Sequence, residues 1–187
     1  MYNPFPFDDP KPINRPKLSE KTINSIVAGG TPNVAKKFVA QIADRAKAEG
    51  VIVGIDGYTT ANWNLFVNLV ARECVINGLE LEVVDAAKAV LKSGKEIDDM
   101  IDPLLIWDTK IDPTLLYGKL YHGGYIGLFD QAKMEQFRKD VPAMKAPGKL
   151  VVVAGYGCMI AELRDLYDIK CWFDITPMKT MLRIRGG

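Results

Sequence analysis

The sequence has few of the residues that bind transition metals. It contains one histidine, His122, and three cysteines among 187 residues. Cys74, Cys158 and Cys171 are separated by unrelated spacings, whereas zinc sites usually take their ligands in close pairs. The composition therefore argues against a zinc site. An odd number of widely spaced cysteines also favours reduced thiols, as in cytoplasmic proteins.

Long apolar runs and an excess of one charge are missing as well. The longest apolar segments, such as LVVVAG, are much shorter than the roughly 20 residues needed to cross a bilayer. The N-terminus lacks the basic region and apolar stretch of a signal peptide. The formal net charge is +1 and no basic stripe is present, which argues against nucleic acid as the main partner. We therefore expect a cytoplasmic protein whose partners are neither membranes nor nucleic acids.

The composition is that of a globular protein, with 48% hydrophobic and 25% charged residues. A chain of 187 residues is long enough for one domain with a real core. Residues 1–16 hold five of the eleven prolines, and proline removes a backbone donor and fixes φ. The sequence thus predicts an extended proline-rich arm over residues 1–17 and a single α/β domain over residues 18–187.

Apolar strands alternate with helical patterns along most of the chain. We predict strands at 51–56, 79–85, 149–155 and 169–175, whereas 103–108 fits either a strand or a short helix. Helices are predicted at 18–30, 31–50, 61–77, 86–94, 112–118, 127–140 and 158–167. Strands that are apolar throughout and separated by helices predict a mostly parallel sheet covered on both faces, that is, a three-layer α/β fold preceded by N-terminal helices.

The segment VIVGIDGYTTANWNLF, residues 51–66, has the strand–loop–helix layout of a phosphate-binding loop. Gly54 and Gly57 are expected to form its bend. Such a loop ends in Gly-Lys-Ser/Thr, and its lysine reaches the β and γ phosphates. Here Asn62, Trp63 and Asn64 occupy those positions, so no lysine offsets phosphate charge. Two interpretations remain open: an anion site without phosphoryl transfer, or an ordinary turn with nothing bound.

The candidate ligand-binding residues of this loop follow the first strand directly. They are Gly54, Asp56, Gly57, Tyr58, Thr59, Thr60, Ala61, Asn62, Trp63 and Asn64. Asp56 could contact a ligand or accept hydrogen bonds from its own loop, and Trp63 could close the pocket or stack on a base.

Other candidates lie outside the loop. His122, beside two glycines, could contact a phosphate or remain a surface residue. Asp85 and Asp108 follow apolar segments, where a carboxylate is either a base or a helix N-cap. Trp107 and Trp172 are expected to pack in the core.

The last third of the chain contains LRDLYD at 163–168 and Phe173-Asp174. These segments resemble the C-terminal half of uridine kinase and its phosphoribulokinase-like relatives, and the resemblance extends over about residues 48–185. It implies a P-loop NTPase-like fold with a degenerate Walker A loop, Asp85 as base toward a substrate hydroxyl, and Arg183 and Arg185 as lid arginines. Because the lysine is missing, we expect binding of a nucleotide or phosphorylated small molecule without efficient phosphoryl transfer, in a regulatory or structural role. Whether ATP and Mg²⁺ bind stays open.

A narrower resemblance concerns GIDGYTTANW, YGKLYHGG and DITPMKTMLRIRGG. These segments are similar to the N-terminal kinase-like domain of some bacterial proteins that look like class I mannose-6-phosphate isomerases. This implies an adjoining catalytic domain, an oligomer, or a chain that is an excerpt of a longer protein. Two alternatives also remain: an active nucleoside or sugar kinase in which Arg183 or Arg185 replaces the lysine, and a protein-interaction module.

Overall fold

A computed structural model describes residues 19–25, 30–113 and 118–186. The predicted arm at 1–17 and most of the helix predicted at 112–118 lie outside these residues. The strands are β1 (Val51–Gly57), β2 (Glu80–Asp85), β3 (Lys149–Ala154) and β4 (Ile169–Phe173). The helices are α1 (Glu20–Ser25), α2 (Gly30–Glu49), α3 (Asn64–Ile76), α4 (Ala86–Val90), α5 (Gly94–Ile101), α6 (Gln131–Ala143) and α7 (Pro177–Gly186), with short 3-10 turns η1 (Asp102–Leu104), η2 (Tyr125–Leu128) and η3 (Arg164–Leu166).

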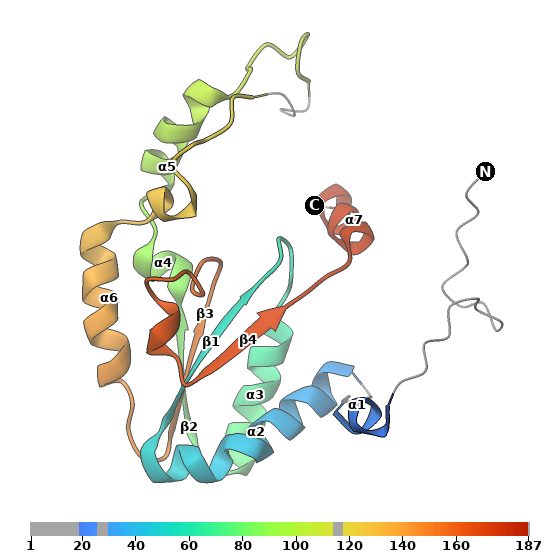
Figure 1. Cartoon of the computed structure of the whole chain (residues 1–187), viewed down its shortest axis with the longest axis vertical. Coiled ribbons are helices and arrows are strands. Elements are labelled where there is room, and N and C mark those ends of the chain that lie inside the picture. The colour runs from blue at the N-terminus through green and yellow to red at the C-terminus, as the bar shows by residue number, and fades with distance from the viewer. Residues whose placement is uncertain (1–18, 26–29, 114–117, 187) are drawn as a thin grey trace, which may run out of the picture.

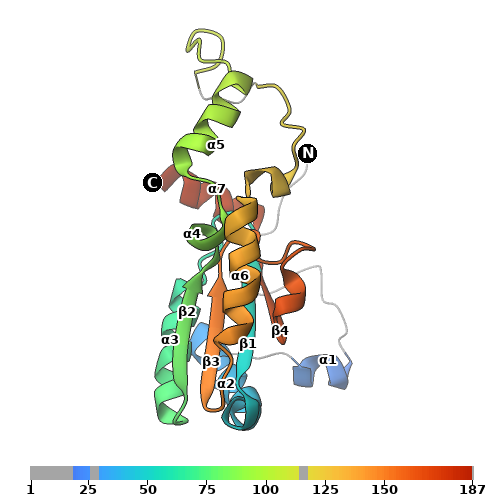
Figure 2. The ribbon, with the colours of Figure 1, turned by 90° about the vertical axis from the view of Figure 1, so that its left-hand side faces the viewer.

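The four strands form one parallel sheet in the order β2-β3-β1-β4. In the centre, Val53 of β1 pairs with Val152 of β3 on one side and with Ile169 of β4 on the other. Helices cover both faces: α6 lies on one side of the sheet and α3 on the other (Figures 1 and 2). The predicted α/β class and parallel sheet are therefore confirmed.

Two apolar cores lie on opposite faces of the sheet because strand side chains alternate in direction. Val53 and Ile55 of β1 belong to the core beneath α2 and α3. Ile52 belongs to the other core, with α4, α6 and the segment that follows β3. All seven residues of β1 are buried, which explains why this strand reads as a continuous apolar run.

Helices α2 and α3 each bury one face. In α2 the buried side chains are Ala35, Val39, Ile42, Ala43 and Ala46, whereas Val34 is exposed. In α3, Val67 is buried and Leu65 is 55% exposed. Helical periodicity predicts an apolar stripe, but the packing partners decide which residues at the edges of the stripe are buried. Helices α2 and α3 pack on each other as well as on the sheet.

In the described part of the chain, the structure excludes the strand alternative for residues 103–108, of which the first two belong to η1, and it contradicts the helix predicted at 158–167. Residues 103–108 form no strand; after η1 they contribute one isolated bridge, between Leu105 and Gly118. Residues 158–167 form turns and η3 in place of an α-helix. Gly157, with φ +83°, begins this irregular course, and Leu163 and Tyr167 still reach the core. Burial there is achieved without helical geometry.

Residues 94–113 and 118–124 project beyond the carboxyl edge of the sheet (Figures 1 and 2). Helix α5 begins with a capping box between Ser93 and Glu96, and none of its residues is buried. Trp107, on this projection, is 58% exposed and Trp172 on β4 is 62% exposed. The prediction that both tryptophans pack in the core was wrong.

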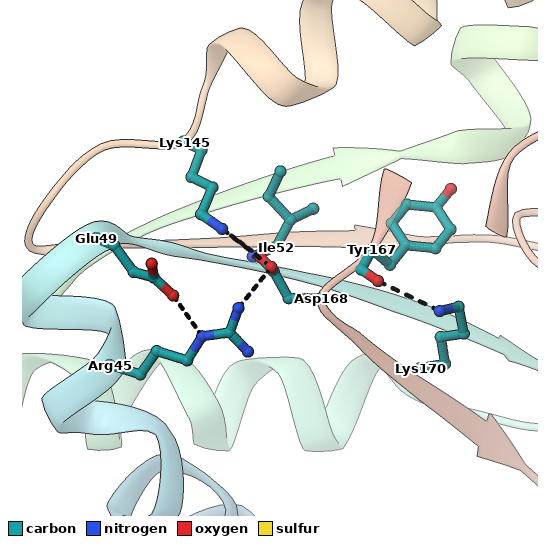
Figure 3. Close-up of polar contacts among 7 residues, drawn as sticks. All are labelled: Arg45, Glu49, Ile52, Lys145, Tyr167, Asp168 and Lys170. Atoms are coloured by element: carbon teal, nitrogen blue, oxygen red, sulfur yellow. Dashed lines mark hydrogen bonds and ion pairs between the residues drawn. The ribbon is translucent and has the colours of Figure 1, made fainter. Parts of the chain in front are cut away.

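At the opposite, amino edge of β1, Asp168 joins several segments (Figure 3). Its carboxylate accepts hydrogen bonds from the Ile52 amide at 2.8 Å, from Lys145 Nζ at 2.9 and 3.0 Å, and from Arg45 Nη2 at 2.8 Å. The Arg45 Nε also donates to Glu49 at 2.6 Å. This cluster fastens α2, β1 and the α6–β3 connection to the start of β4.

Candidate functional site

The candidate site lies at the carboxyl edge of the sheet, where residues that follow the strands line solvent-accessible hollows. The chain leaves β1 toward α3 on one face, whereas the segment after the adjacent strand β3 packs on the other face. Neighbouring connections that leave on opposite faces create a crevice, and ligands of parallel α/β sheets bind outside such strand ends. The loop at residues 58–63 lies at this point.

Asp56 joins the two loops that border the crevice. It is 6% exposed. Its Oδ1 accepts a hydrogen bond from the Gly57 amide at 2.8 Å, and its Oδ2 accepts from the Gly157 amide at 3.0 Å and the Met159 amide at 3.1 Å. The carboxylate thus binds its own loop, which was one of the two alternatives for Asp56. It also binds the loop after β3, and the sequence did not predict this second contact.

The bend after β1 lies at residues 58–61, later than expected. Gly54 is inside β1, where a Cβ atom would overlap the ring of Tyr167. Gly57 is the last strand residue, and a Cβ there would overlap Phe173 of β4. Both glycines are therefore required for close packing. The turn itself is closed by the Ala61 amide, which donates to the Tyr58 carbonyl at 2.8 Å.

Thr60 is the strained residue of this loop. Its φ is +68°, which is a real outlier for a β-branched side chain. Its amide donates to the Tyr156 hydroxyl at 3.0 Å, and its own hydroxyl is buried without a hydrogen-bond partner among the described residues. The loop is held in this conformation from both sides, since the Tyr58 amide also donates to the Phe173 carbonyl at 2.9 Å.

The residues in the positions of the P-loop Gly, Lys and Ser/Thr begin α3. Asn62 accepts a hydrogen bond from the Asn64 amide at 3.0 Å. Trp63 is the N-cap residue, and its ring meets the ring of Tyr156 edge to face at a centroid distance of 4.9 Å. Trp63 therefore braces Tyr156 and does not extend into solvent as a lysine would.

Several hollows border this loop, and three of them are lined by different residues of it. The Asp56 hollow, of about 500 Å³, is lined by Asp56, Gly57, Thr59, Tyr125, Tyr156, Gly157, Met159, Ile160 and Trp172. The α3 hollow, of about 380 Å³, is lined by Trp63, Asn64, Val67, Val83, Val84, Asp85, Ala87, Ala154, Gly155 and Tyr156. The α7 groove, of about 250 Å³, is lined by Ala61, Asn62, Phe173, Asp174, Ile175, Thr176, Lys179 and Arg183. Tyr156 separates the first two.

Helix α7 brings positive charge to the loop. Arg183 Nη1 donates to the Thr60 carbonyl, and the Thr180 hydroxyl donates to the Thr59 carbonyl at 3.5 Å. Lys179, one turn before Arg183, lines the same groove. The structure thus brings the predicted Arg183 to the loop, and it adds Lys179, which the i, i+4 spacing could have identified. Arg185 is exposed and lines none of the three hollows.

Asp85, Tyr58 and His122, the remaining predicted site residues, do not come together at one place. Asp85 is the N-cap of α4: it accepts from the Lys88 amide at 3.1 Å, and Lys88 Nζ lies 3.6 Å from its Oδ2. It also lines the α3 hollow. Tyr58 lines a fourth hollow with residues 174–177. His122 lies on the exposed segment before η2 and lines none of these hollows.

Burial and the Asp56 charge change the ionisation of the groups nearby. Burial foremost, and then Asp56, raises the pKa of Tyr125. The same two causes raise the pKa of the Cys158 thiol to about 12. Both groups are therefore held in their neutral forms, mainly by burial. Sequence reasoning did not identify Tyr125 or Tyr156 as site residues, because neither follows a recognisable motif.

Within residues 19–25, 30–113 and 118–186, no three or more His, Cys, Asp or Glu side chains come together as a metal site. In the same residues, no helix combines the length and apolar character needed to cross a membrane.

A comparison with curated proteins finds no match. A family model described as "Domain of unknown function (DUF8485)" matches residues 35–187, which include the whole sheet and all three hollows. The chain therefore belongs to the DUF8485 family.

Proposed function

We propose that the carboxyl edge binds a nucleotide or another phosphorylated small molecule without efficient phosphoryl transfer. The domain would then be a degenerate, uridine kinase-like P-loop NTPase with a regulatory or structural role in the cytoplasm. An oligomer or an adjoining catalytic domain would receive its signal.

The observation that carries this proposal is the pair of cations on α7. Lys179 and Arg183 line one groove with Asn62 of the loop. Arg183 also contacts the Thr60 carbonyl directly. The groove also contains Asp174, whose Oδ1 already accepts from the Ile175 amide at 2.8 Å. Two cations against one carboxylate leave a net positive charge, which suits a phosphate, since arginine binds phosphate oxygens through charge-assisted hydrogen bonds. The charge that the loop lacks is thus supplied by another element.

The strain at Thr60 supports the same position. A positive φ and a buried, unpartnered hydroxyl in one residue cost free energy, and such outliers concentrate at functional sites. The strained residue is also the one whose carbonyl Arg183 contacts. We therefore place the anion beside residues 60–62.

The residues present fit Mg-ATP chemistry poorly. Kinases of this type use a loop lysine and carboxylates or hydroxyls that hold Mg²⁺. Here Trp63, in the position of the loop lysine, is braced against Tyr156. Asp85 caps α4, which disfavours its proposed role as base. These contacts favour binding over transfer.

A protein-interaction function is the second candidate, favoured by the outer face of α7. Four apolar side chains of this helix are 51–67% exposed: Met178, Met181, Leu182 and Ile184. An apolar cluster of this kind on one short helix is typical of a docking surface. Such a surface would allow α7 to transmit occupancy of the groove to a partner.

The experiment is calorimetric titration with ADP, ATP, UMP and sugar phosphates, with thermal unfolding in parallel. A ligand at a hundred times its Kd should stabilise the fold by about 2.7 kcal/mol. Arg183→Ala should weaken binding at least tenfold, whereas the matched control Arg185→Ala, two residues away, should change it less than threefold.

Three outcomes would contradict the proposal. Equal effects of the two arginine variants would show that only the general charge of α7 matters. Release of ADP at a steady rate when pooled nucleosides and sugars are added with Mg-ATP would establish the active-kinase alternative. If no compound shifts the melting temperature, the interaction function is favoured.

A further inference from the structure

The Asp56 hollow differs in charge from the α7 groove. Among its lining residues are one carboxylate and three aromatic side chains, Tyr125, Tyr156 and Trp172, and they include neither lysine nor arginine. A phosphate placed there would meet the negative charge of Asp56 without a counter-charge. The hollow is therefore unsuited to the anion proposed for the groove, and it requires a ligand group of the opposite character.

Asp56 offers this hollow a fixed negative charge with acceptor capacity to spare. Its Oδ2 accepts two amide hydrogen bonds and its Oδ1 accepts one, whereas each oxygen of a carboxylate has room for about two. One position on Oδ1 thus remains for a ligand donor. The raised pKa of Tyr125, caused by burial and then by Asp56, shows that this charge acts across the hollow.

The aromatic side chains come from three different elements that converge on the hollow. Tyr125 belongs to η2, Tyr156 follows β3, and Trp172 lies on β4. Two of the rings are braced from behind: Tyr156 by Trp63 at 4.9 Å and Tyr125 by Phe129 at 5.7 Å. Aromatic rings attract cations by their negative faces, tryptophan most strongly, and several rings around one cavity are the usual recognition device for ammonium groups.

We infer that the Asp56 hollow binds an organic ammonium group, held by the Asp56 carboxylate and by Tyr125, Tyr156 and Trp172. The volume of about 500 Å³ is sufficient for a substituted amine. The inference does not depend on the anion proposed for the α7 groove, because the two sites share no lining residue.

The test compares choline with its neutral isostere 3,3-dimethylbutan-1-ol by calorimetric titration of the full chain. Choline should bind saturably and at least tenfold more tightly than the alcohol, since both occupy the same volume and only one is charged. Trp172→Leu should weaken choline binding about 3- to 30-fold. The control is Trp107→Leu, a tryptophan of similar exposure (58% against 62%) on the projection, and it should leave binding unchanged.

A second variant tests the charge. Asp56→Asn removes the negative charge and keeps one oxygen for the Gly157 and Met159 amides, whereas its NH2 group replaces the acceptor of the Gly57 amide. Choline binding should fall at least tenfold in protein whose near- and far-UV circular dichroism is unchanged. The inference is overturned if choline and butylammonium do not bind saturably, if the alcohol binds as tightly as choline, or if Trp172→Leu and Trp107→Leu act alike. Cytidine that displaces choline with higher affinity would also overturn it, since the hollow would then be a nucleobase site.

Discussion

At the scale of the residue, Asp168 shows how one side chain can hold distant segments together. Its carboxylate is 17% exposed and lies within hydrogen-bond distance of Lys145 and Arg45 as well as of the Ile52 amide (Figure 3). Hydrogen bonds to charged groups contribute about 1.5–3 kcal/mol each, more than neutral ones. The cluster lies at the amino edge, away from the three hollows, so it acts on stability alone.

Asp168→Asn should therefore destabilise the protein by about 1–3 kcal/mol. Asparagine keeps an acceptor for the Ile52 amide but leaves the partly buried Lys145 without its counter-charge. Urea denaturation measures the loss. Asp165→Asn, an exposed residue of η3, is the control and should change stability by less than about 0.5 kcal/mol. A similar loss in both variants would refute the role assigned to Asp168.

The same cluster predicts how stability depends on pH. Partial burial acts to raise the pKa of Asp168, but the Ile52 amide, Lys145 and Arg45 outweigh it, so the pKa lies below its ordinary value. A depressed carboxylate pKa contributes stability above the unfolded-state value of about 3.9, and that contribution is lost as the pH falls through the folded-state pKa. The difference in unfolding free energy between wild type and Asp168→Asn should be constant from pH 5 to 7 and should shrink below about pH 4. A difference that persists at pH 2 would exclude this linkage.

At the scale of the element, β1 depends on a glycine that serves packing. Gly54 lies at the middle of a strand whose residues are all buried, and the ring of Tyr167 covers the position where a Cβ would stand. The strand is flanked on both sides by β3 and β4, so neither its backbone nor the ring has room to move. The glycine that the sequence suggested for the bend of a phosphate-binding loop thus serves strand packing.

Gly54→Ala should destabilise the protein by about 1–3 kcal/mol, the usual cost of overpacking a core. Gly94→Ala is the matched control, because a Cβ at that position meets no atom within 4 Å and the residue opens α5. It should be neutral or slightly stabilising. Thermal and urea unfolding of both variants give the comparison. Equal stability of Gly54→Ala and wild type would show that Tyr167 moves freely.

At the scale of the whole molecule, the two cores share one sheet and are expected to unfold together. Cys74 is buried in the core beneath α2 and α3, and Cys158 in the core beneath α4 and α6. Burial, followed by a nearby carboxylate, raises the pKa of Cys74 to about 11 and that of Cys158 to about 12. Since the thiolate is the reactive form, neither thiol reacts until the fold opens.

Maleimide labelling at pH 8 in a Cys171→Ser background should therefore report the same opening free energy at Cys74 and Cys158. The rates at both sites should rise in parallel with urea, because opening exposes the whole sheet. Mass spectrometry of digested protein resolves the two sites. Opening free energies that differ by more than about 1.4 kcal/mol, a tenfold ratio of rates, would show that the two faces unfold separately.

The sequence by itself determined the strands, the long helices and the class of fold. Strands such as Val51–Gly57 are buried on both faces and must be apolar throughout, so they are visible in any short window of sequence. The capping of α1 by Ser19, whose hydroxyl accepts from the Thr22 amide at 3.2 Å, and the end of α2 at Gly50, with φ +76°, are also local. Local patterns failed at residues 158–167, where burial is reached through turns.

Only the tertiary structure decided which side chains meet at the carboxyl edge. Asp56 and the Gly157 amide are 101 residues apart in the chain, and Arg183 and Thr60 are 123 apart. Periodicity and motif spacing act over at most a few turns of helix, so they carry no information about such pairs. The candidate site exists because the order β2-β3-β1-β4 places the loops after β1 and β3 side by side and brings α7, which follows β4, against the loop after β1. The sequence gives the residue types of the loop itself. The order of the strands decides which charged and aromatic side chains of other elements lie beside that loop.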